Sequence, residues 1–453
     1  MSGVASSVNP LGTRRDCLKA AAAGVVGAGL GRVSRGESGA AVAGEERSPI
    51  RSCVVLYQYG GPSQLETFDP KPNAPSEIRG EYATIATSVA GVRFGEHLPR
   101  LAERMDRLAL VRSVHHPMRN HNSAAAETLT GRTPLGGDLE LLADDARSYP
   151  SLGSLIAYGL GVRAHALPYV ALPYAMINVV QLPGQTPGIL GGKYDRFQVQ
   201  GDPQAADFRV AALAPPSGRT ERGLADREQL FHRLDRESGL APRQQSMTVY
   251  QQRALALIRS EHLRSSFDMT LEAESVRDRY GRTLFGQSAL LARKLVKEGI
   301  NCVAVFNGQH NGQDANWDSH QNIFPRHRQL IPPYDQAVSA LIDDLADRGL
   351  LESTLIVSMA EFGRTPKING SAGRDHWPDC YTVTFAGGGV RGGAVHGASD
   401  KIAAYPDRDA VTPGDLVATI LWRFGVDPLG EFLDPSNRPF RLAEGRPLKS
   451  LFG

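Results

Sequence analysis

Short, unbroken apolar runs separated by helical patterns constrain the fold of this chain more than any other feature. Five runs have the length of buried strands, at residues 53–59, 108–114, 301–306, 354–360 and 381–387. Because polar residues do not alternate with apolar ones in these runs, both faces of each strand are expected to be covered. Helical patterns lie between some of the runs, at residues 286–299 and 332–350. This order predicts an α/β fold in which a mostly parallel sheet is sandwiched between helices.

Polar motifs follow four of these runs. They are GGPSQLETFD (60–69), HHPMRNHNSAAAETLTGRTP (115–134), NGQHNGQDANWDSH (307–320) and EFGRTP (361–366). In sheets of this kind, ligands bind outside the C-terminal ends of the strands. We therefore expect the functional side chains at that edge of the sheet.

The N-terminal segment is typical of an export signal. Arg14 and Arg15 precede an apolar Ala/Gly/Val run at residues 20–31, and the small residues AVA at 41–43 offer a cleavage site. This order predicts a twin-arginine signal peptide over residues 1–43, recognised by the twin-arginine translocase, and a periplasmic or extracellular mature protein. Twelve weakly hydrophobic residues are too few for a membrane span, which needs about twenty. A disordered basic tail is the alternative.

The remaining chain, residues 44–453, is predicted to be one domain of balanced charge. Removing residues 1–43 leaves 45 basic and 46 acidic residues, so no basic surface for nucleic acid is expected. A Pro-, Arg- and Gln-rich stretch at residues 201–251 predicts an insertion or cap in the middle of the chain. Cys53, Cys302 and Cys380 are widely separated and form no disulfide framework, although one disulfide remains open in an oxidising destination.

Acidic and imidazole groups gather in two of the polar loops. Asp318 and His320 stand two residues apart, where extended backbone projects both to one side, and this pair suits a divalent metal such as zinc. The alternative is a turn aspartate beside a solvent-facing histidine. Asp375 and His376 add a second acid and base in GRDHWP, bounded by Gly and Pro, and are two further candidate metal ligands.

Glu361 closes a strand that should be buried, so its charge needs a partner. One interpretation is a metal ligand, with Arg364 facing an anionic substrate because guanidinium matches phosphate and sulfate oxygens. The other is a structural ion pair between Glu361 and Arg364.

A third group of candidates follows the second run. His116 and His121 lie close to Ser123, just before a segment of small residues that can start a helix. A hydroxyl at a helix N-terminus is either a nucleophile or an N-cap, and capping is the commoner role.

Five motifs together carry a resemblance to one family. LYQYGGPSQLETFDPKPNAP, EHLPRLAERMDRLALVRSVHH, WDSH, EFGRTPKI and GRDHWP occur in this order and resemble the bacterial exported proteins grouped as domain of unknown function 1501. The resemblance runs from about Arg51 to the C-terminus. That family is similar to a divergent branch of the alkaline phosphatase and sulfatase superfamily. The superfamily resemblance implies a mixed, mostly parallel sheet between helices, with one or two metal ions at the strand ends and a hydroxyl or formylglycine nucleophile.

The resemblance also implies roles for particular residues. Asp318 and His320 would match an Asp/His metal pair, Glu361 the acid after the next strand, and His376 a late histidine ligand. Residues 121–134 look like the nucleophile helix, which places His121 where the nucleophile falls. The chain departs from the pattern at three points: no cysteine has the formylglycine context, Glu361-Phe362 replaces Asp-His, and Gly60-Gly61 replaces an acid.

Two functions follow as hypotheses. The first is a metal-dependent hydrolase of sulfate or phosphate esters, including esters of carbohydrate, with zinc, calcium, magnesium or manganese. In it Arg364 or Arg374 would stabilise charge on the ester oxygens, Ser123 or a metal-bound water would attack, and His121 or His116 would transfer protons. The second is a non-catalytic exported protein of the same fold that binds an anionic polysaccharide.

Overall fold

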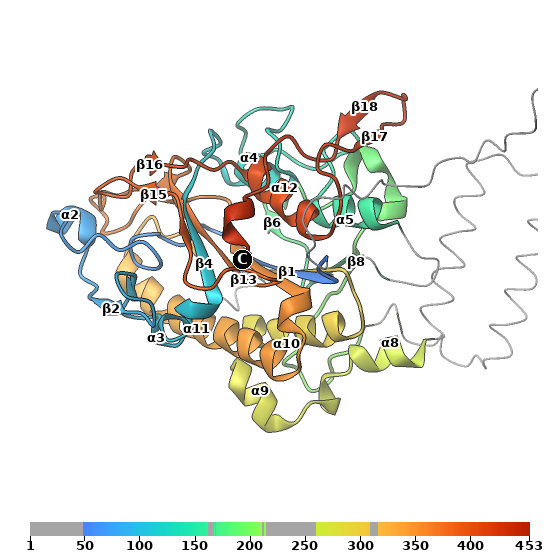
Figure 1. Ribbon diagram of the computed structural model, residues 1–453, viewed down its shortest axis with the longest axis horizontal. Coiled ribbons are helices and arrows are strands. Elements are labelled where there is room, and N and C mark those ends of the chain that lie inside the picture. The colour runs from blue at the N-terminus through green and yellow to red at the C-terminus, as the bar shows by residue number, and fades with distance from the viewer. Residues whose placement is uncertain (1–48, 162–166, 168, 211–212, 214–259, 309–315) are drawn as a thin grey trace, which may run out of the picture. The chain divides into compact units, whose positions relative to one another are not determined.

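The core of the computed structural model is an eight-stranded mixed sheet (Figure 1). The structure describes residues 49–161, 167, 169–210, 213, 260–308 and 316–453. The sheet has the order β14 (Val395–His396), β4 (Leu108–Val114), β13 (Tyr381–Gly387), β10 (Thr354–Met359), β1 (Ser52–Gln58), β9 (Cys302–Asn307), β5 (Tyr169–Leu172) and β8 (Phe197–Gln198). The predicted fold, a mostly parallel sheet between helices, is confirmed.

The five predicted strands are five neighbours in the middle of this sheet. β13 alone among them runs antiparallel to its neighbours β10 and β4, so β4 again points the same way as β10. The strands β5, β8 and β14 were not predicted, and the last two are only two residues long. Runs this short carry no periodicity that a sequence pattern can detect.

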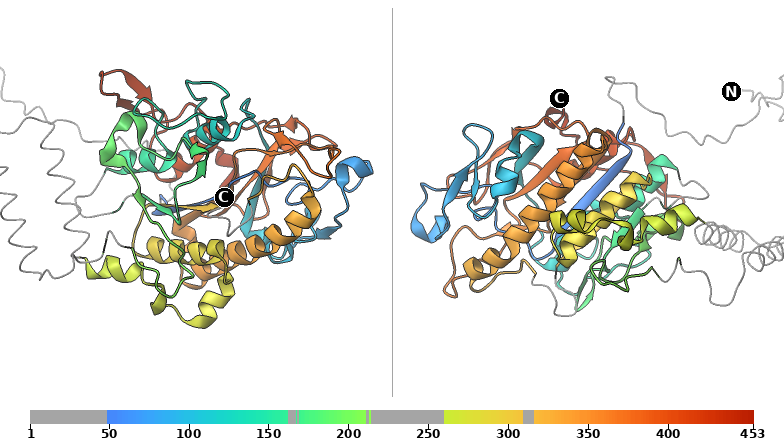
Figure 2. Two further views of the ribbon diagram at one scale, coloured as in Figure 1. Left: turned by 180° about the vertical axis from the view of Figure 1, so that it is seen from behind. Right: turned by 90° about the horizontal axis from the view of Figure 1, so that it is seen from below.

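The central strand β1 shows why an unbroken apolar run suits this position. Val54 and Leu56 pack into one hydrophobic cluster with α10 (Leu284–Lys297) and α11 (Ile323–Asp347). Val55 and Tyr57 point to the other face and pack with α12 (Pro413–Arg423) and α5 (Leu152–Leu160). Figure 2 shows α10 and α11 crossing one face of the sheet.

The remaining elements are short. Among the described residues, the other α-helices are α2 (Ser76–Arg79), α3 (Pro99–Ala102), α4 (His121–Thr130), α8 (Glu261–Ser266) and α9 (Glu274–Tyr280). Five two-stranded ribbons pair β2 (Thr84–Ala86) with β3 (Arg93–Gly95), β6 (Ile177–Asn178) with β7 (Val180–Gln181), β11 (Gly363–Arg364) with β12 (His376–Trp377), β15 (Ala398–Ser399) with β16 (Pro406–Arg408), and β17 (Glu431–Leu433) with β18 (Pro439–Arg441).

The prediction for α11 was wrong at its start. We expected a helix from residue 332, yet α11 begins at Ile323 and carries Pro332 and Pro333 inside it. Each proline removes a helical hydrogen bond. The buried side chains of Ile323, Phe324 and Ile331 hold the first turns against the core, so tertiary packing outweighs the local cost.

Helices α4 and α12 pack on the same face of the sheet, and small residues let them approach. Gly131 ends α4 in the left-handed region, and a Cβ there would lie 2.8 Å from a methyl group of Val417 in α12. Thr412 and Asp415 form a reciprocal capping box that starts α12. The C-terminal end of α4 therefore lies directly against α12.

Two predicted segments lie wholly or mostly outside the described residues. The signal at 1–43 lies outside the described residues, as does most of the 201–251 insertion. Within the described residues, no helix combines the length and apolar character needed to cross a membrane. Cys53, Cys302 and Cys380 are buried free thiols.

Candidate metal centre

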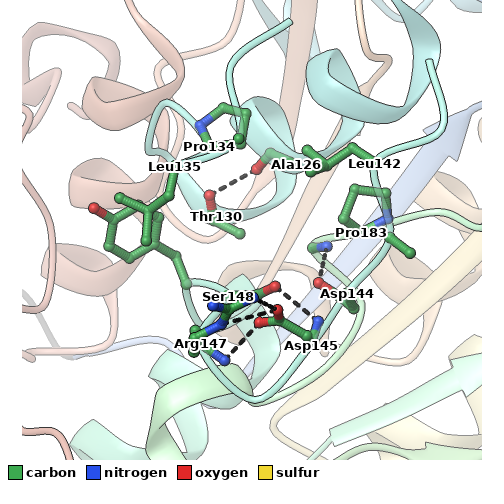
Figure 3. Close-up of a pocket in the computed structure, with 14 residues that line it drawn as sticks. Ala126, Thr130, Pro134, Leu135, Leu142, Asp144, Asp145, Arg147, Ser148 and Pro183 are labelled. Atoms are coloured by element: carbon green, nitrogen blue, oxygen red, sulfur yellow. Dashed lines mark hydrogen bonds and ion pairs between the residues drawn. The ribbon is translucent and has the colours of Figure 1, made fainter. Parts of the chain in front are cut away.

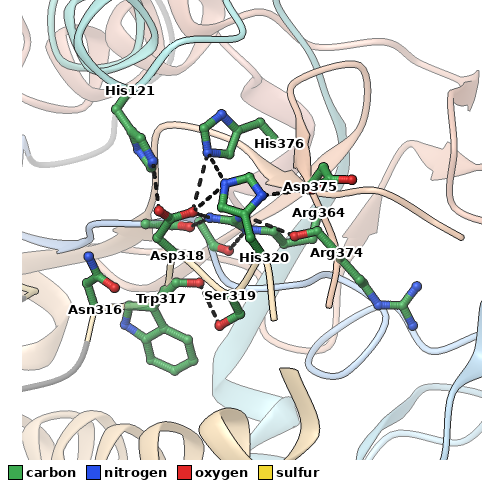
Figure 4. Close-up of polar contacts among 12 residues, drawn as sticks. His121, Asn316, Trp317, Asp318, Ser319, His320, Arg364, Arg374, Asp375 and His376 are labelled. Carbon is green, nitrogen blue, oxygen red and sulfur yellow. Dashed lines mark hydrogen bonds and ion pairs between the residues drawn. The ribbon is translucent and has the colours of Figure 1, made fainter. Parts of the chain in front are cut away.

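Side chains from four separate segments meet at the C-terminal edge of the sheet. His121 begins α4 after β4, Asp318 and His320 follow β9, and His376 lies in the ribbon β11–β12 (Figure 4). Glu361 follows β10. Parallel strands end at the same edge, so the fold brings together groups that lie up to 255 residues apart.

Asp318 is the centre of the cluster. Its Oδ1 lies 3.0 Å from His320 Nε2 and 3.3 Å from His376 Nε2, and its Oδ2 lies 3.5 Å from His121 Nε2. The Nε2 atoms of His320 and His376 are only 2.9 Å apart. The ligand atoms of His121, Asp318 and His376 all fall within 4.8 Å of one another, a spacing that can hold one metal ion.

Each of the three imidazoles has its other nitrogen fixed by an acceptor. Nδ1 of His121 lies 2.8 Å from Glu361 Oε1, Nδ1 of His320 lies 2.8 Å from Asp375 Oδ1, and Nδ1 of His376 lies 2.8 Å from the carbonyl oxygen of Arg119. Carbonyl and carboxylate oxygens only accept, so each Nδ1 carries the proton and donates it. The three Nε2 atoms are therefore left to face Asp318, which is the arrangement of histidine ligands supported by outer-shell acceptors.

The pKa of His121 is raised and the pKa of Asp318 is lowered where the two side chains meet. Burial alone would favour the neutral ring of His121, but hydrogen bonds with Asp318 and Glu361 outweigh it and raise its pKa to about 9. Burial likewise opposes ionisation of Asp318, yet His121, His320, His376 and Arg364 hold its pKa well below its usual range. A proton or a metal cation between Nε2 and the carboxylate satisfies both sides.

Glu361 places a buried carboxylate next to His121, outside the group of ligand atoms. Its side chain is fully buried, and Oε1 accepts from His121 Nδ1 and from the backbone N–H of Gly60, 2.7 Å away. Oε2 is buried without a hydrogen-bond partner among the described residues. An uncompensated carboxylate oxygen is costly, so the donor set of imidazole and carboxylate fits a divalent cation such as zinc.

Arg364 contacts Asp318 from the interior of the protein and does not face outward. Its guanidinium is fully buried, and Nη2 donates to Asp318 Oδ1 at 2.7 Å. Nε donates to the carbonyl of Gly61 at 3.0 Å, and Nη2 also donates to the carbonyl of Gly60. The ion pair weighed above between Arg364 and Glu361 is replaced by one with Asp318. We expect Arg364 to position Asp318 and the Gly60-Gly61 turn.

Arg374 is also engaged within the protein. Its fully buried guanidinium forms two hydrogen bonds with Glu66, of 3.1 and 2.6 Å, and donates to the carbonyls of Thr365, Pro366 and Ile78. Such a fork-to-fork pair fixes geometry. We expect Arg374 to hold the 365–375 loop. Because both guanidinium groups are bound to protein groups, we propose no substrate-facing role for either arginine.

Ser123 and His116 lie at the border of the cluster. The hydroxyl of Ser123 is buried and donates to Asp138 at 2.5 Å. His116 Nε2 donates to the carbonyl of Glu361 at 2.6 Å, and burial lowers the pKa of His116 to about 4. These contacts hold the start of α4 and the end of β10, while the predicted roles in attack and proton transfer stay predictions.

Two acidic residues that the sequence analysis did not identify complete the support. Asp138 accepts from the backbone N–H groups of Arg119 and Asn120, and Glu140 accepts from the backbone N–H of His121 at 3.1 Å. No sequence signal could have found them, because Asn is a favoured N-cap residue and only the structure shows that the Asn120 side chain does not cap α4.

Gly60 makes the approach of these segments possible. Its φ is +106°, and a Cβ would lie 2.3 Å from the backbone nitrogen of Asp318. The Trp317 N–H donates to the Tyr59 carbonyl at 3.0 Å, so the Asp318 loop lies directly against the end of β1. Gly373 plays the same part on the other side, since its Cβ would lie 2.1 Å from the carbonyl carbon of His320.

We expect His327 to make the free energy of unfolding sensitive to acid. It is fully buried in α11, its Nδ1 donates to the carbonyl of Ile323 at 3.1 Å, and its Nε2 accepts from the Ser63 N–H at 3.4 Å. Burial, followed by the charges of Arg364 and Arg374, lowers its pKa to about 3. Because the folded pKa lies below the unfolded value of about 6.5, stability is complete above pH 6.5 and is lost as pH falls toward 3, by about 1.4 kcal/mol per pH unit.

The variant His327→Gln should remove this contribution. We expect the free energy of unfolding, measured with urea at pH 7.5, 6.0 and 5.0, to fall less steeply in the variant by about 1 kcal/mol per pH unit. The matched control is His262→Gln, because the His262 side chain is 82% exposed. An unchanged slope in His327→Gln would show that another group sets the acid sensitivity.

The fold and the cluster define an α/β protein with a candidate metal centre at the C-terminal edge of its sheet. Residues 50–452 match the family described as protein of unknown function (DUF1501), and the chain belongs to this family. The family predicted from the five motifs is thus confirmed. No curated protein matches the chain.

Several solved structures are similar to the chain at low sequence identity. The protein Ps i-CgsB in complex with k-i-k-neocarrahexaose shares 12% identity and a TM-score of 0.42, over 88% of this chain and 75% of its own. A 2-O GAG sulfatase shares 11% identity and a TM-score of 0.42, over 89% and 74%. A protein in the alkaline phosphatase superfamily from Vibrio parahaemolyticus shares 11% identity and a TM-score of 0.39, over 84% and 68%.

Proposed function

We propose that this chain is a metal-dependent hydrolase of sulfate or phosphate esters. The observation that carries the proposal is the convergence of three Nε2 atoms on Asp318, each with its Nδ1 held by an acceptor. A divalent cation bound by such groups lowers the pKa of water and polarises ester oxygens. His121, Asp318, His320 and His376 would hold it.

The other residues of the centre orient these ligands. Glu361 and Asp375 keep the Nδ1 protons of His121 and His320 in place, and Arg364 anchors Asp318. Asp375 and His320 are also the more exposed members, with side-chain exposures of 54% and 41%.

A second candidate function is a binding protein without turnover. It is favoured by the engagement of Ser123 with Asp138 and of both arginines with protein groups, which leaves no assigned nucleophile or anion clamp in the described cluster. In this case the chain would bind an anionic polysaccharide through the same edge.

Metal content and ester hydrolysis together test the first function. The protein, prepared without chelators or affinity metals, should contain about one equivalent of a divalent ion by mass spectrometry. It should hydrolyse p-nitrophenyl sulfate or phosphate and lose that activity with EDTA. A folded protein that stays metal-free after incubation with zinc, calcium, magnesium and manganese would overturn the hydrolase. A metal-bound protein that binds esters without turnover would support the second function.

We also infer export through the twin-arginine translocase, on the order of Arg14-Arg15, apolar run and AVA site. The double variant Arg14→Lys/Arg15→Lys should keep the precursor in the cytoplasm, as seen by cell fractionation and N-terminal sequencing. The control is Arg32→Lys/Arg35→Lys, which makes the same two charge-conserving substitutions after the apolar run. Export of the first variant at the normal level would refute this pathway.

A further inference from the structure

An open cavity and a set of exposed aliphatic side chains lie beside α4, outside the metal centre. The cavity has a volume of about 310 Å³ and is formed by α4, residues 134–149 and residues 183–184 (Figure 3). This volume lies in the range of small-molecule sites, about 300–1,000 Å³. It offers a concave receptor rather than a flat surface.

The polar groups around the cavity are already satisfied. The Asp144 carboxylate accepts from the backbone N–H groups of Gly184, Gln185 and Thr186, at 3.0 to 3.1 Å. The Thr130 hydroxyl donates to the Ala126 carbonyl, and Arg147 pairs with Asp145. What the cavity offers to a ligand is therefore mainly the apolar surface of Leu135, Leu142, Pro134 and Pro183, which Figure 3 shows around its rim.

Further exposed aliphatic side chains lie on two segments that meet at Glu140, next to the start of α4. Leu139 and Leu141 flank Glu140, and Ile177 and Val179 flank Asn178. The polar residue of each trio points inward, because Asn178 Nδ2 donates to Glu140 Oε1. The aliphatic neighbours are left in solvent, the reverse of what alternation on a water-facing edge provides. Exposed aliphatic groups gathered in this way mark binding sites.

The segment of residues 134–149 connects this surface to the candidate metal centre. Glu140 accepts from the His121 N–H at 3.1 Å, and the carbonyl of Leu142 accepts from Asn122 Nδ2 at 2.7 Å. Ala126 and Thr130, which line the cavity, lie five and nine residues beyond His121 along α4. At 1.5 Å per residue, Ala126 and Thr130 are about 7.5 and 13.5 Å from His121 along the helix axis.

We propose that the substrate of the metal centre is an anionic ester with an apolar group, and that the surface formed by the cavity and by Leu135, Leu139, Leu141, Ile177 and Val179 receives that group. This inference rests on the proposed function, because it places the ester at His121 and Asp318. The surface would then select among esters by their apolar part, since burial of apolar area provides affinity without directional contacts.

The test measures binding of ethyl and octyl sulfate, and of ethyl and octyl phosphate, to the metal-loaded full chain by calorimetry below micelle concentrations. We expect the octyl ester of the preferred anion to bind at least about tenfold more tightly than its ethyl ester. Leu135→Ser/Leu141→Ser should remove this difference and leave ethyl ester binding unchanged. Leu271→Ser is the matched control, because Leu271 and Leu141 are both 64% exposed.

Each other outcome decides against one part of the argument. Equal, metal-dependent binding of ethyl and octyl esters would overturn the apolar selection while the proposed function stands. Octyl binding that persists with EDTA, without any ethyl binding, would leave the apolar surface and refute the ester centre. Tighter binding of glucose 6-sulfate or 6-phosphate than of the octyl esters, or a dimer lost in Leu135→Ser/Leu141→Ser, would assign the surface to sugar or to a second copy and overturn the inference.

Discussion

The double variant His320→Ala/His376→Ala is expected to lose its divalent ion and its ester hydrolysis while remaining folded. Both imidazoles direct Nε2 to Asp318, and their Nε2 atoms lie 2.9 Å apart. Removing them leaves one imidazole and one carboxylate of the group, too few for a typical four-coordinate site. We expect the metal content to fall from about one equivalent to below about 0.1, and kcat/KM to fall at least about 10³-fold, since a metal supplies several kcal/mol of transition-state stabilisation.

Metal content is measured by mass spectrometry, hydrolysis with p-nitrophenyl esters, and folding by circular dichroism. The control His262→Ala/His396→Ala removes two histidines outside the cluster and should change none of the three. Full metal content in His320→Ala/His376→Ala would place the ion elsewhere. Retained binding of an anionic polysaccharide, with no turnover in either protein, would favour the second function.

The variant Gly60→Ala is expected to disrupt the centre through the backbone alone. A Cβ at this position would lie 2.3 Å from Asp318 N and 2.7 Å from the carbonyl carbon of Trp317, so the loop carrying Asp318 must move. The backbone N–H and C=O of Gly60 also bond Glu361 and Arg364. We expect a loss of about 3 kcal/mol or more in the free energy of unfolding, since overpacking and a strained φ add together. Metal affinity should fall at least about tenfold.

Gly299→Ala separates the two causes. Gly299 has a φ of +84°, yet a Cβ there meets nothing within 4 Å. This control should show only the backbone strain, about 1–2 kcal/mol, with unchanged metal binding. Equal losses in both variants, measured by urea unfolding and metal titration, would mean that the contact between Gly60 and Asp318 has no effect of its own.

The sequence predicted the sheet well where strands are buried on both faces. The unbroken runs identified β1, β4, β9, β10 and β13, because burial on both faces leaves a continuous apolar signature. It could not give the antiparallel direction of β13, which depends on the path of the connecting chain. The helical pattern placed the start of α11 at Pro332, and only packing against the core shows that the helix begins earlier.

The sequence indicated only some of the residues that meet around Asp318. Asp318 and His320 are close in sequence, so their spacing indicates a shared ligand role. His121 was assigned to proton transfer or to the nucleophile position, because nothing in the sequence tells that the first turn of α4 reaches Asp318. The arginines looked suited to an anion, whereas the structure surrounds them with backbone carbonyls and carboxylates. Spacing records local proximity, and these partners are set by tertiary contacts.

The ribbon β11–β12 limits how this chain can change in length. Arg364 pairs across it with His376, so the anchor of Asp318 and one of its imidazole neighbours stand opposite each other in register. A strand turns successive side chains to opposite sides, and one residue inserted between Asp375 and His376 would direct the imidazole away from Asp318. Single insertions and deletions at this point should therefore damage the centre more than most substitutions do. Two-residue insertions or deletions restore the side of the strand but shift the position of the imidazole, so their effect should lie between those of single insertions and of substitutions.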